Sequence, residues 1–115
     1  MRRKSLAVVT AALVALATSA VPAVAATKNV KVADNFFSPA KLTVKPKTTI
    51  KWKWSNVNAD SHDVFLNKGP SGVKKFHSAP AATFFSFKRT LKKTGRYKFV
   101  CTLHEEMRMT ITVRR

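Results

Sequence analysis

Hydrophobic and polar residues alternate along most of the chain beyond residue 27. In TTIKWKWSN (48–56), one isoleucine and two tryptophans alternate with lysines, and in RYKFVCT (96–102) Tyr, Phe and Cys take alternate positions. A period of two residues is typical of a β-strand with one buried face. The same alternation predicts further strands at 28–34, 40–46, 62–67, 82–91 and 107–115.

Turn-forming residues separate these predicted strands. The breaks NFFSP, KPKT, SNVNADS, NKGPSG and KKTG are rich in Pro, Gly, Asn and Ser. No segment after the first 26 residues has a convincing helical period. Seven short strands in under a hundred residues predict an all-β protein, an antiparallel β-sandwich that forms one domain without internal repeats.

The N-terminal segment has a different pattern. Three basic residues precede an apolar run from Leu6 to Val21, and small residues follow, namely Ala23, Ala25 and Ala26. This three-part plan predicts a secretory signal peptide over residues 1–26, cleaved after Ala25 or Ala26, which leaves one domain over 27–115. An uncleaved membrane anchor is the alternative. It is less favoured because AVAA suits a signal peptidase and no stop-transfer charges follow at once. We therefore expect a secreted or periplasmic protein, or one on the exterior of the cell envelope.

The charge of the predicted domain is strongly positive. It keeps 19 of the chain's 22 basic residues against 5 acidic ones, a formal charge of +14. Such a field favours polyanions, anionic membrane or wall surfaces, or acidic proteins as neighbours. Specific nucleic-acid binding is not expected, because the aromatic residues follow the parity of the core and do not line a surface with the lysines. A single Cys101 cannot form an internal disulfide, so a bound metal is an obvious means of support for so small a domain.

One nine-residue stretch, CTLHEEMRM (101–109), concentrates metal-binding chemistry. It holds the chain's one cysteine, one of its three histidines and both methionines other than the initiator. Parity places Cys101 inward at the end of one strand and Met107 inward at the start of the next, with His104 in the connecting loop. His62, at the head of HDVFL, could complete a site from a remote strand. One thiolate, two imidazoles and a weak axial thioether suit copper that alternates between Cu(I) and Cu(II).

Each of these residues has a plainer interpretation. A lone buried cysteine often packs as a small hydrophobe, and His62 and His104 could be ordinary turn or surface histidines. Met109 competes with Met107 for the axial position, but it lies about 7 Å deeper along the strand and is expected in the core. His77 has no partner motif and is expected to be an ordinary surface histidine. Trp52 and Trp54 are expected to pack in or near the core.

These motifs carry a family resemblance. GRYKFVCTLHEEMRMTITV, with SHDVF upstream, resembles the cupredoxins, the small type 1 blue copper proteins, and is most similar to those of the amicyanin and plastocyanin type. The C-x2-H-x2-M spacing matches the short ligand loop of the amicyanin type. FFSPAKLTV followed by IKWKWSN is similar to the first strands of the family. The resemblance covers about Val30 to Val113.

The resemblance implies a Greek-key β-sandwich of seven or eight strands that holds one copper ion. It implies His62, Cys101, His104 and Met107 as the metal ligands, with Met109 as the less favoured axial alternative. It also implies that the backbone N–H of Asp63 points at the cysteine sulfur. The activity implied is one-electron transfer between redox protein partners whose identity the sequence does not give, carried out by a monomer.

The sequence departs from the family pattern at three places. Asp63 follows the remote histidine where an asparagine is usual, and the loop glycine expected before the strand at 48–56 is replaced within KPKT. Glu105 and Glu106 follow His104, where the family tends to present apolar or neutral residues. Together with Asp60 and Asp63 they place four of the five acidic residues beside the candidate histidines, while Asp34 lies elsewhere in the sequence.

Other function classes fit these residues less well. An enzyme would use Cys101 as a nucleophile and His104 as its base, but the pair sits at a strand end with no third group to orient it, so no enzymatic activity is expected. A copper carrier or storage protein would use the same ligands without redox cycling, and it is the main alternative.

Overall fold

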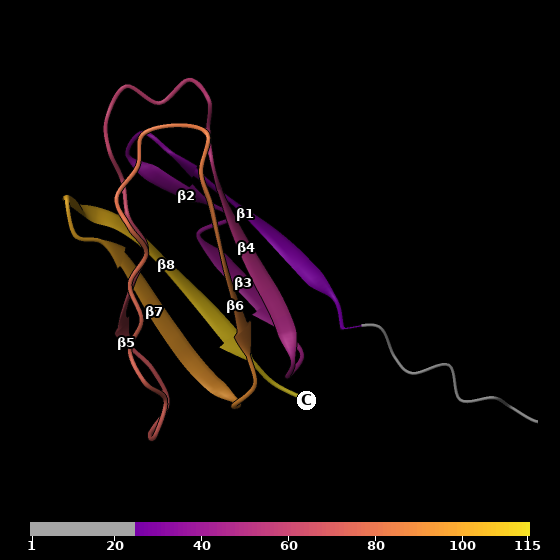
Figure 1. Ribbon diagram of the computed structural model, residues 1–115. Helices are drawn as coiled ribbons and strands as arrows, with labels where there is room; N and C mark the ends of the chain where they lie inside the picture. Colours follow the sequence, from indigo (N-terminus) through magenta and orange to yellow (C-terminus); the bar gives the residue numbers. More distant parts are fainter. Residues whose placement is uncertain (1–24) are drawn as a thin grey trace, which may run out of the picture.

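The computed structural model describes residues 25–115, and the predicted signal peptide therefore lies almost entirely outside the described residues. Two four-stranded sheets pack face to face (Figure 1), with strand orders β2-β1-β4-β6 and β3-β8-β7-β5. The chain crosses repeatedly between the sheets, which confirms the predicted all-β, Greek-key sandwich with eight strands. The strands are β1 (Thr27–Ala33), β2 (Phe36–Ser38), β3 (Lys41–Val44), β4 (Thr48–Trp54), β5 (Phe65–Lys68), β6 (Ser86–Leu91), β7 (Gly95–Cys101) and β8 (His104–Val113). Nothing among these residues forms a helix able to cross a membrane.

Both sheets are mixed. Strands β1 and β4 pair in parallel, as do β3 and β8, whereas the other four pairings are antiparallel. The alternation of residues reveals which face of a strand is buried but not which strand lies beside it or in which direction, so the parallel pairs were not foreseen. Strand β2 falls within NFFSP, which the sequence analysis treated as a break.

The core lies between the sheets and follows the predicted parity. Trp52 is fully buried, and its ring centroid lies 5.0 Å from that of Phe99 and 5.8 Å from that of Phe87. Trp54 is buried as well, so both tryptophans are core residues as expected. At the edge strand β6, the guanidinium of Arg89 lies 4.3 Å from the Phe87 ring centroid and covers the open side of the aromatic cluster.

The turn before β4 uses a lysine in an unusual backbone conformation. Lys47 has a φ of 72°, in the left-handed region that glycine adopts most easily. It occupies the segment where the family pattern has a loop glycine. The turn is held because Lys47 N–H donates to the carbonyl of Leu91 over 2.8 Å and the hydroxyl of Thr48 donates to the carbonyl of Lys45 over 2.7 Å.

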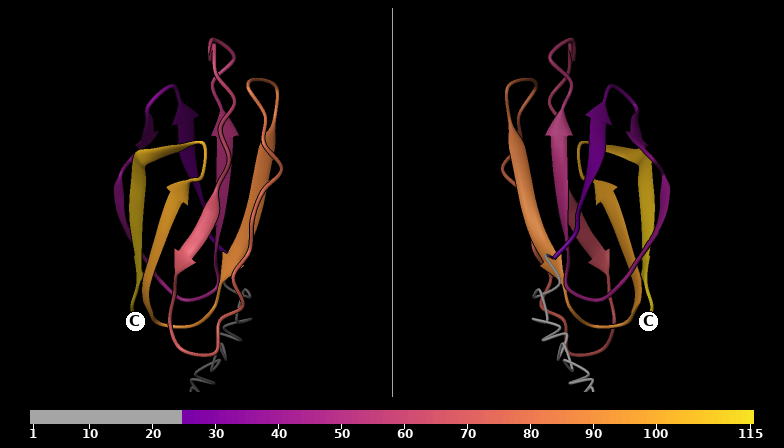
Figure 2. Two further views of the ribbon diagram at one scale, coloured as in Figure 1. Left: turned by 90° about the vertical axis from the view of Figure 1, so that its left-hand side faces the viewer. Right: turned by 90° about the vertical axis from the view of Figure 1, so that its right-hand side faces the viewer.

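Several connections meet at one end of the sandwich. The β1–β2 turn, the segment after β4, the segment before β6 and the β7–β8 turn all lie at the end opposite the C-terminus (Figures 1 and 2). Hydrogen bonds join them, since Asp34 accepts from the backbone N–H groups of Ala59 and Asp60, and Asn58 donates to the carbonyls of Val32 and Ala82. This end of the molecule, called the site end below, contains the candidate ligands.

Candidate metal centre

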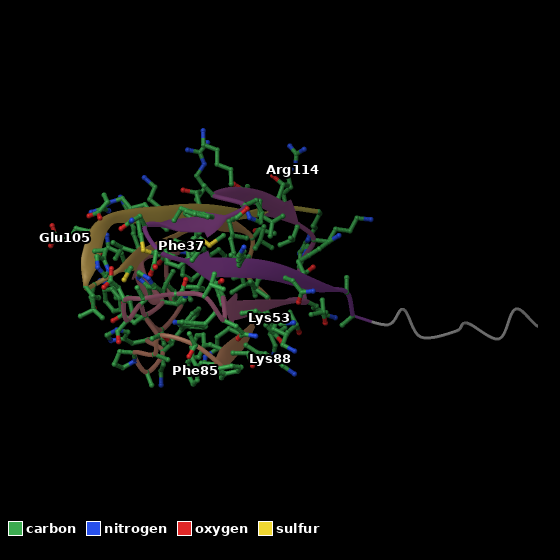
Figure 3. The ribbon with its side chains drawn as sticks, turned by 90° about the horizontal axis from the view of Figure 1, so that it is seen from above. Phe37, Lys53, Phe85, Lys88, Glu105 and Arg114 are labelled. Carbon is green, nitrogen blue, oxygen red and sulfur yellow. The ribbon has the colours of Figure 1, made fainter. Side chains whose placement is uncertain are left out.

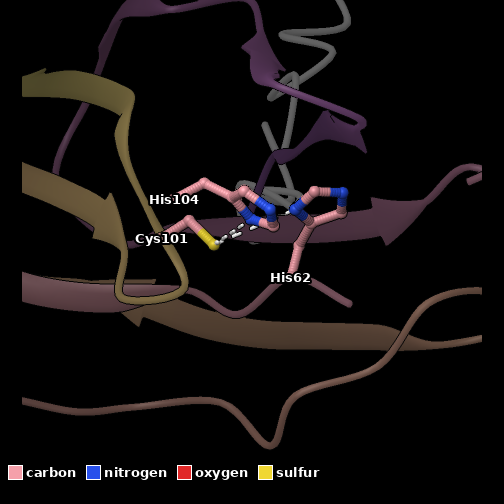
Figure 4. Close-up of side chains that lie close together, drawn as sticks. All are labelled: His62, Cys101 and His104. Atoms are coloured by element: carbon pink, nitrogen blue, oxygen red, sulfur yellow. Dashed lines mark hydrogen bonds between the residues drawn. The ribbon is translucent and has the colours of Figure 1, made fainter. Parts of the chain in front are cut away.

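Three side chains converge at the site end, namely His62, Cys101 and His104 (Figure 4). Their ligand atoms all lie within 4.8 Å of one another. The Cys101 sulfur is 3.9 Å from Nδ1 of His62 and 3.7 Å from Nδ1 of His104. The two imidazole rings are tilted by 48° to each other, and their centroids lie 4.8 Å apart. The structure therefore brings one sulfur and two imidazole nitrogens together from segments 39 residues apart.

A short hairpin fixes two of these residues. Cys101 ends β7 and His104 begins β8, and the two are paired across a turn formed by Thr102 and Leu103. The pairing shifts register between Val100 and Cys101, and both of these residues are buried. His104 was expected in a longer loop, with the next strand beginning at residue 107. The strand instead extends back to His104 and leaves this side chain partly exposed.

The backbone of His62 is held from two sides. Its N–H donates to the carbonyl of Ala81 over 2.9 Å, and Ala81 N–H donates back over 3.0 Å. The carbonyl of His62 also accepts a bond from the indole N–H of Trp54 over 3.0 Å. The side chain is fully buried, whereas that of His104 reaches the surface.

Asp34 fixes the ring of His62 from the opposite side. Its carboxylate lies 2.7 Å from Nε2, which leaves Nδ1 to face the cysteine sulfur. The backbone N–H of Ala59, followed by the bond with His62, lowers the pKa of Asp34 below its usual value. A carboxylate that holds the outer nitrogen of a metal-binding histidine is a common arrangement in metal sites. The position of Asp34 in the sequence predicted that it lies away from the site, and this prediction is wrong. The β1–β2 turn brings it to His62 across 28 residues of sequence, a distance that no local motif reveals.

Asp63 joins three segments below the ligands. Its buried carboxylate accepts a bond from the backbone N–H of Thr102 over 2.6 Å and a second from the hydroxyl of the same residue. It also lies 2.7 Å from Nε2 of His77. Burial opposes its ionisation, but the bonds from Thr102 and His77 lower the pKa of Asp63 below its usual value. His77 is about half exposed, as expected of a surface histidine, but it has this partner, which the sequence analysis did not foresee.

The Cys101 sulfur lies among backbone donors. The backbone N–H groups of Asp63, Leu103 and His104 lower the pKa of its thiol, and the Asp63 N–H as a donor to the sulfur stays a prediction. Burial raises the pKa of the Cys101 thiol, and the three N–H groups act in the opposite direction by stabilising the thiolate. The carboxylate of Asp63 raises this pKa further.

The two methionines differ in what their sulfurs contact. Met109 is buried, and its sulfur accepts a bond from the indole N–H of Trp52 over 3.4 Å, deep between the sheets. Met107 is also buried, and it lies two residues nearer than Met109 to the end of β8 at the site end. The Met109 sulfur is thus engaged by the core, as expected of a core residue.

The donor set suits copper. One thiolate and two imidazoles in a compact cluster match the His₂Cys arrangement of electron-transfer copper sites. Strand pairing and the hydrogen bonds of Asp34 and Asp63 fix the segments that carry the donors. No second group of three such side chains gathers within residues 25–115.

Solved structures with a similar fold include several of amicyanin. The reduced Cu(I) form at pH 4 of one amicyanin mutant has a TM-score of 0.66 and 24% identity, with 78% of this chain and 82% of that chain covered. A second reduced amicyanin mutant has a TM-score of 0.67 and 22% identity, with 81% and 87% covered. A copper-containing nitrite reductase from Thermus scotoductus matches at a TM-score of 0.66 and 22% identity, over 80% of this chain but only 23% of that one. At these identities the likeness establishes the fold.

Sequence comparison identifies the family. No curated protein matches the chain at a significant level. The family model described as the cupredoxin-like domain matches residues 6–113, which is nearly the whole chain. The chain therefore belongs to the cupredoxin-like domain family.

Proposed function

We propose that the protein is a mononuclear type 1 copper protein that carries single electrons between redox partners and is not an enzyme. His62, Cys101 and His104 would hold the ion, with the Met107 thioether as a weak axial ligand. The observation that carries this proposal is the convergence of two Nδ1 atoms and one sulfur within 4.8 Å. The engagement of the Met109 sulfur by Trp52 favours Met107 as the axial ligand.

The ion would supply a one-electron couple between Cu(II) and Cu(I). The residues around it keep the donors nearly fixed. Asp34 orients His62, the carboxylate of Asp63 holds the β7–β8 turn through Thr102, and three N–H groups stabilise the thiolate of Cys101. Because these contacts come from strands and buried segments, the donors need to move little when the charge at the centre changes, which favours fast electron transfer.

The exposed side of the centre suggests where electrons leave. His62 is fully buried, whereas His104 reaches the surface directly after Leu103, whose side chain is about half exposed. A redox partner would therefore contact the site end through His104, and the protein would act as a monomer. Glu105 and Glu106 are exposed beside this contact, so it would be acidic around a small apolar spot.

The location follows from the sequence. The signal peptide over residues 1–26 would export the protein to the periplasm, the cell-envelope exterior or the medium. The formal charge of +14 on the remaining domain would then favour association with an anionic membrane or wall surface through one flank.

One visible spectrum of the copper-loaded protein, together with its midpoint potential, tests the proposed function. We expect an intense thiolate-to-copper band and reversible one-electron cycling, both abolished by Cys101→Ser in a variant that keeps its β-rich circular dichroism. A colourless, tightly held Cu(I) form would indicate a copper carrier or storage protein instead. A blue Cys101→Ser variant would overturn the assignment of the site.

A further inference from the structure

The outer face of the sheet β2-β1-β4-β6 carries four lysines on three adjacent strands, Lys31, Lys51, Lys53 and Lys88, here called the lysine face. Lys31 lies directly opposite Lys53 across the β1–β4 pair, and Lys51 lies opposite Lys88 across the β4–β6 pair. Three of the four side chains are exposed and Lys51 is half-buried. Like charges directly opposite one another on neighbouring strands destabilise a sheet.

Nothing in the described part of the chain neutralises this charge. Within residues 25–115, no lysine or arginine lies within ion-pair distance of a carboxylate, and the two contacts of this kind involve only histidines. All five acidic residues lie at the site end, within two residues of a candidate ligand or hydrogen-bonded to one. In Figure 3, Glu105 lies at that end, whereas Lys53 and Lys88 lie along the flank. The lysine face is therefore a concentrated positive surface without an internal counter-charge.

An exposed aromatic residue borders the same face. Phe84 is 83% exposed and has a φ of 51°, a conformation that a bulky side chain rarely adopts. It lines a shallow hollow together with Lys51, Lys53 and Phe85. Phe85 packs inward on Trp54, with ring centroids 4.8 Å apart, so its neighbour Phe84 has no place in the core. A strained, solvent-exposed phenylalanine that makes no core contact indicates a role outside folding.

We propose that the lysine face and Phe84 together form a docking surface for an anionic phospholipid bilayer. The lysines contact the headgroups and Phe84 enters the interfacial layer, a combination that binds peripheral proteins to membranes. A flat face spread over three strands with an aromatic at its rim suits a bilayer. A single-stranded nucleic acid would need several exposed aromatics on which successive bases stack, whereas Phe84 is the one exposed aromatic side chain that lines this hollow.

This docking would leave the metal centre accessible. Lys53 and Lys88 of the lysine face lie along the side of the sandwich, whereas Glu105, the neighbour of His104, lies at its end (Figure 3). A bilayer-bound molecule would lie on its flank and present the site end to a diffusing partner. This inference depends on one part of the proposed function, namely the export of the protein to a compartment where the surface of a bilayer is exposed.

The opposite sheet provides a matched control. Its outer face also carries exposed cations, among them Lys41, Lys68, Arg96 and Lys98, and Lys68 lies opposite Lys98. The large hydrophobic side chains that are exposed among the described residues are Phe36, Val57, Phe84 and Leu103, and none of them lies on the four strands of this sheet, β3, β8, β7 and β5. Removing four charges from either face changes the net charge of the protein equally. The two variants will therefore differ in their affinity for anionic vesicles only if one face is a docking surface.

Vesicle co-sedimentation tests the charge requirement. The probes are vesicles of phosphatidylcholine with about one third phosphatidylglycerol, and vesicles of phosphatidylcholine alone, at low salt. A lysine near an anionic surface contributes roughly a fivefold change in binding. We expect Lys31→Gln/Lys51→Gln/Lys53→Gln/Lys88→Gln to weaken binding to the anionic vesicles by about 100-fold or more, and Lys41→Gln/Lys68→Gln/Arg96→Gln/Lys98→Gln to weaken it by less than about tenfold. Equal losses in the two variants would mean diffuse electrostatic attraction and would overturn the proposal.

Two substitutions of Phe84 test insertion. Phe84→Gly should weaken vesicle binding about fivefold or more while the melting temperature stays the same or rises, because glycine accepts the positive φ. Phe84→Trp should retain binding, and its new fluorescence should be quenched by brominated lipids. The parent fluorescence should not be quenched, because Trp52 and Trp54 are buried. Unchanged binding by Phe84→Gly, an unquenched Phe84→Trp, or tighter binding to soluble polyphosphate than to vesicles would each overturn the proposal.

The same measurements are made on the copper-free and the copper-loaded protein. Binding through the lysine face does not need the metal, so we expect equal affinities for the vesicles. Loss of the blue spectrum with intact vesicle binding would overturn only the proposed electron-carrier function. A normal spectrum with no preference for anionic vesicles would overturn only the docking surface.

Discussion

At the scale of single residues, Asp34 and His62 show how a remote carboxylate can orient a candidate metal-binding histidine. The 2.7 Å contact at Nε2 fixes the ring, and two backbone N–H groups fix the carboxylate in turn. Partners of this kind commonly change metal affinity by 10- to 100-fold when they are removed.

We therefore expect Asp34→Ala to weaken copper binding by about 10- to 100-fold in a competition titration with a chelator. Asp60→Ala is the matched control, because it removes the same negative charge. Asp60 lies two residues before His62, but its side chain is exposed and does not contact the ring. Equal losses in the two variants would point to net charge, and not to orientation of the ring, as the cause.

The axial position can be tested with two matched substitutions. We expect Met107→Leu to keep the blue band and raise the midpoint potential, because a weak donor to Cu(II) is lost. Met109→Leu should instead change mainly the stability, since its sulfur accepts a bond from the buried Trp52 indole. A potential shift confined to the Met109 variant would reverse the assignment.

Spacing in the sequence sufficed to propose the four ligands but not the residues that support them. Cys101, His104 and Met107 lie within seven residues of one another, and parity places the side chains of Cys101 and Met107 inward. The contacts of Asp34 with His62 and of His77 with Asp63 depend on which loops meet at the end of the sandwich. That meeting is a property of the tertiary fold, and no period or local motif encodes it.

At the scale of elements, the buried faces were predictable and the pairing of strands was not. Every strand with a clean period of two appears in the structure, with Ile50, Tyr97 and Ile111 buried as expected. The three-residue β2 is too short to show a period, and its Asn, Ser and Pro neighbours indicated a turn. The residues before Ser86 alternate like a strand, but they form the connection that carries Phe84.

The turn before β4 offers a test of local strain. We expect Lys47→Gly to raise the free energy of unfolding by up to about 1 kcal/mol, because the φ of 72° costs a side-chain-bearing residue more than it costs glycine. Lys45→Gly is the control in the same turn, where no positive φ is found, and it should destabilise by about 0.5–1 kcal/mol. Urea unfolding of both variants measures whether the free energy of unfolding rises in Lys47→Gly and falls in Lys45→Gly.

At the scale of the whole molecule, the charges are segregated. The five acidic residues gather at the site end, whereas Lys53, Lys88 and Arg114 lie away from Glu105 in Figure 3; Arg108 is a basic residue at the site end, where its side chain donates to the carbonyl of Glu105. Four of the five acidic residues lie beside the candidate histidines in the sequence, and the fold of the β1–β2 turn brings the fifth, Asp34, to His62.

Negative charge near the centre should favour Cu(II) over Cu(I). We expect Glu105→Gln/Glu106→Gln to raise the midpoint potential by roughly 10–40 mV at low salt, the range that Coulomb's law gives for two exposed charges about 10 Å away in water. The rise should shrink as salt is added, because exposed charges are screened beyond about 8–10 Å at ordinary ionic strength. A potential that does not change would show that these glutamates act only on partners.

The separation between His62 and the Cys101–His104 hairpin has a mechanical consequence. An ion held by all three would cross-link the chain and close a loop of 39 residues that contains β5, β6, β7 and the long segment between β5 and β6. In the chain-entropy description of disulfides, closing a loop of that length is worth about 4 kcal/mol. In a domain without a disulfide, the metal would thus act as a removable staple. We expect copper to raise the melting temperature and to slow protease cleavage between β5 and β6, and equal digestion rates with and without copper would contradict this.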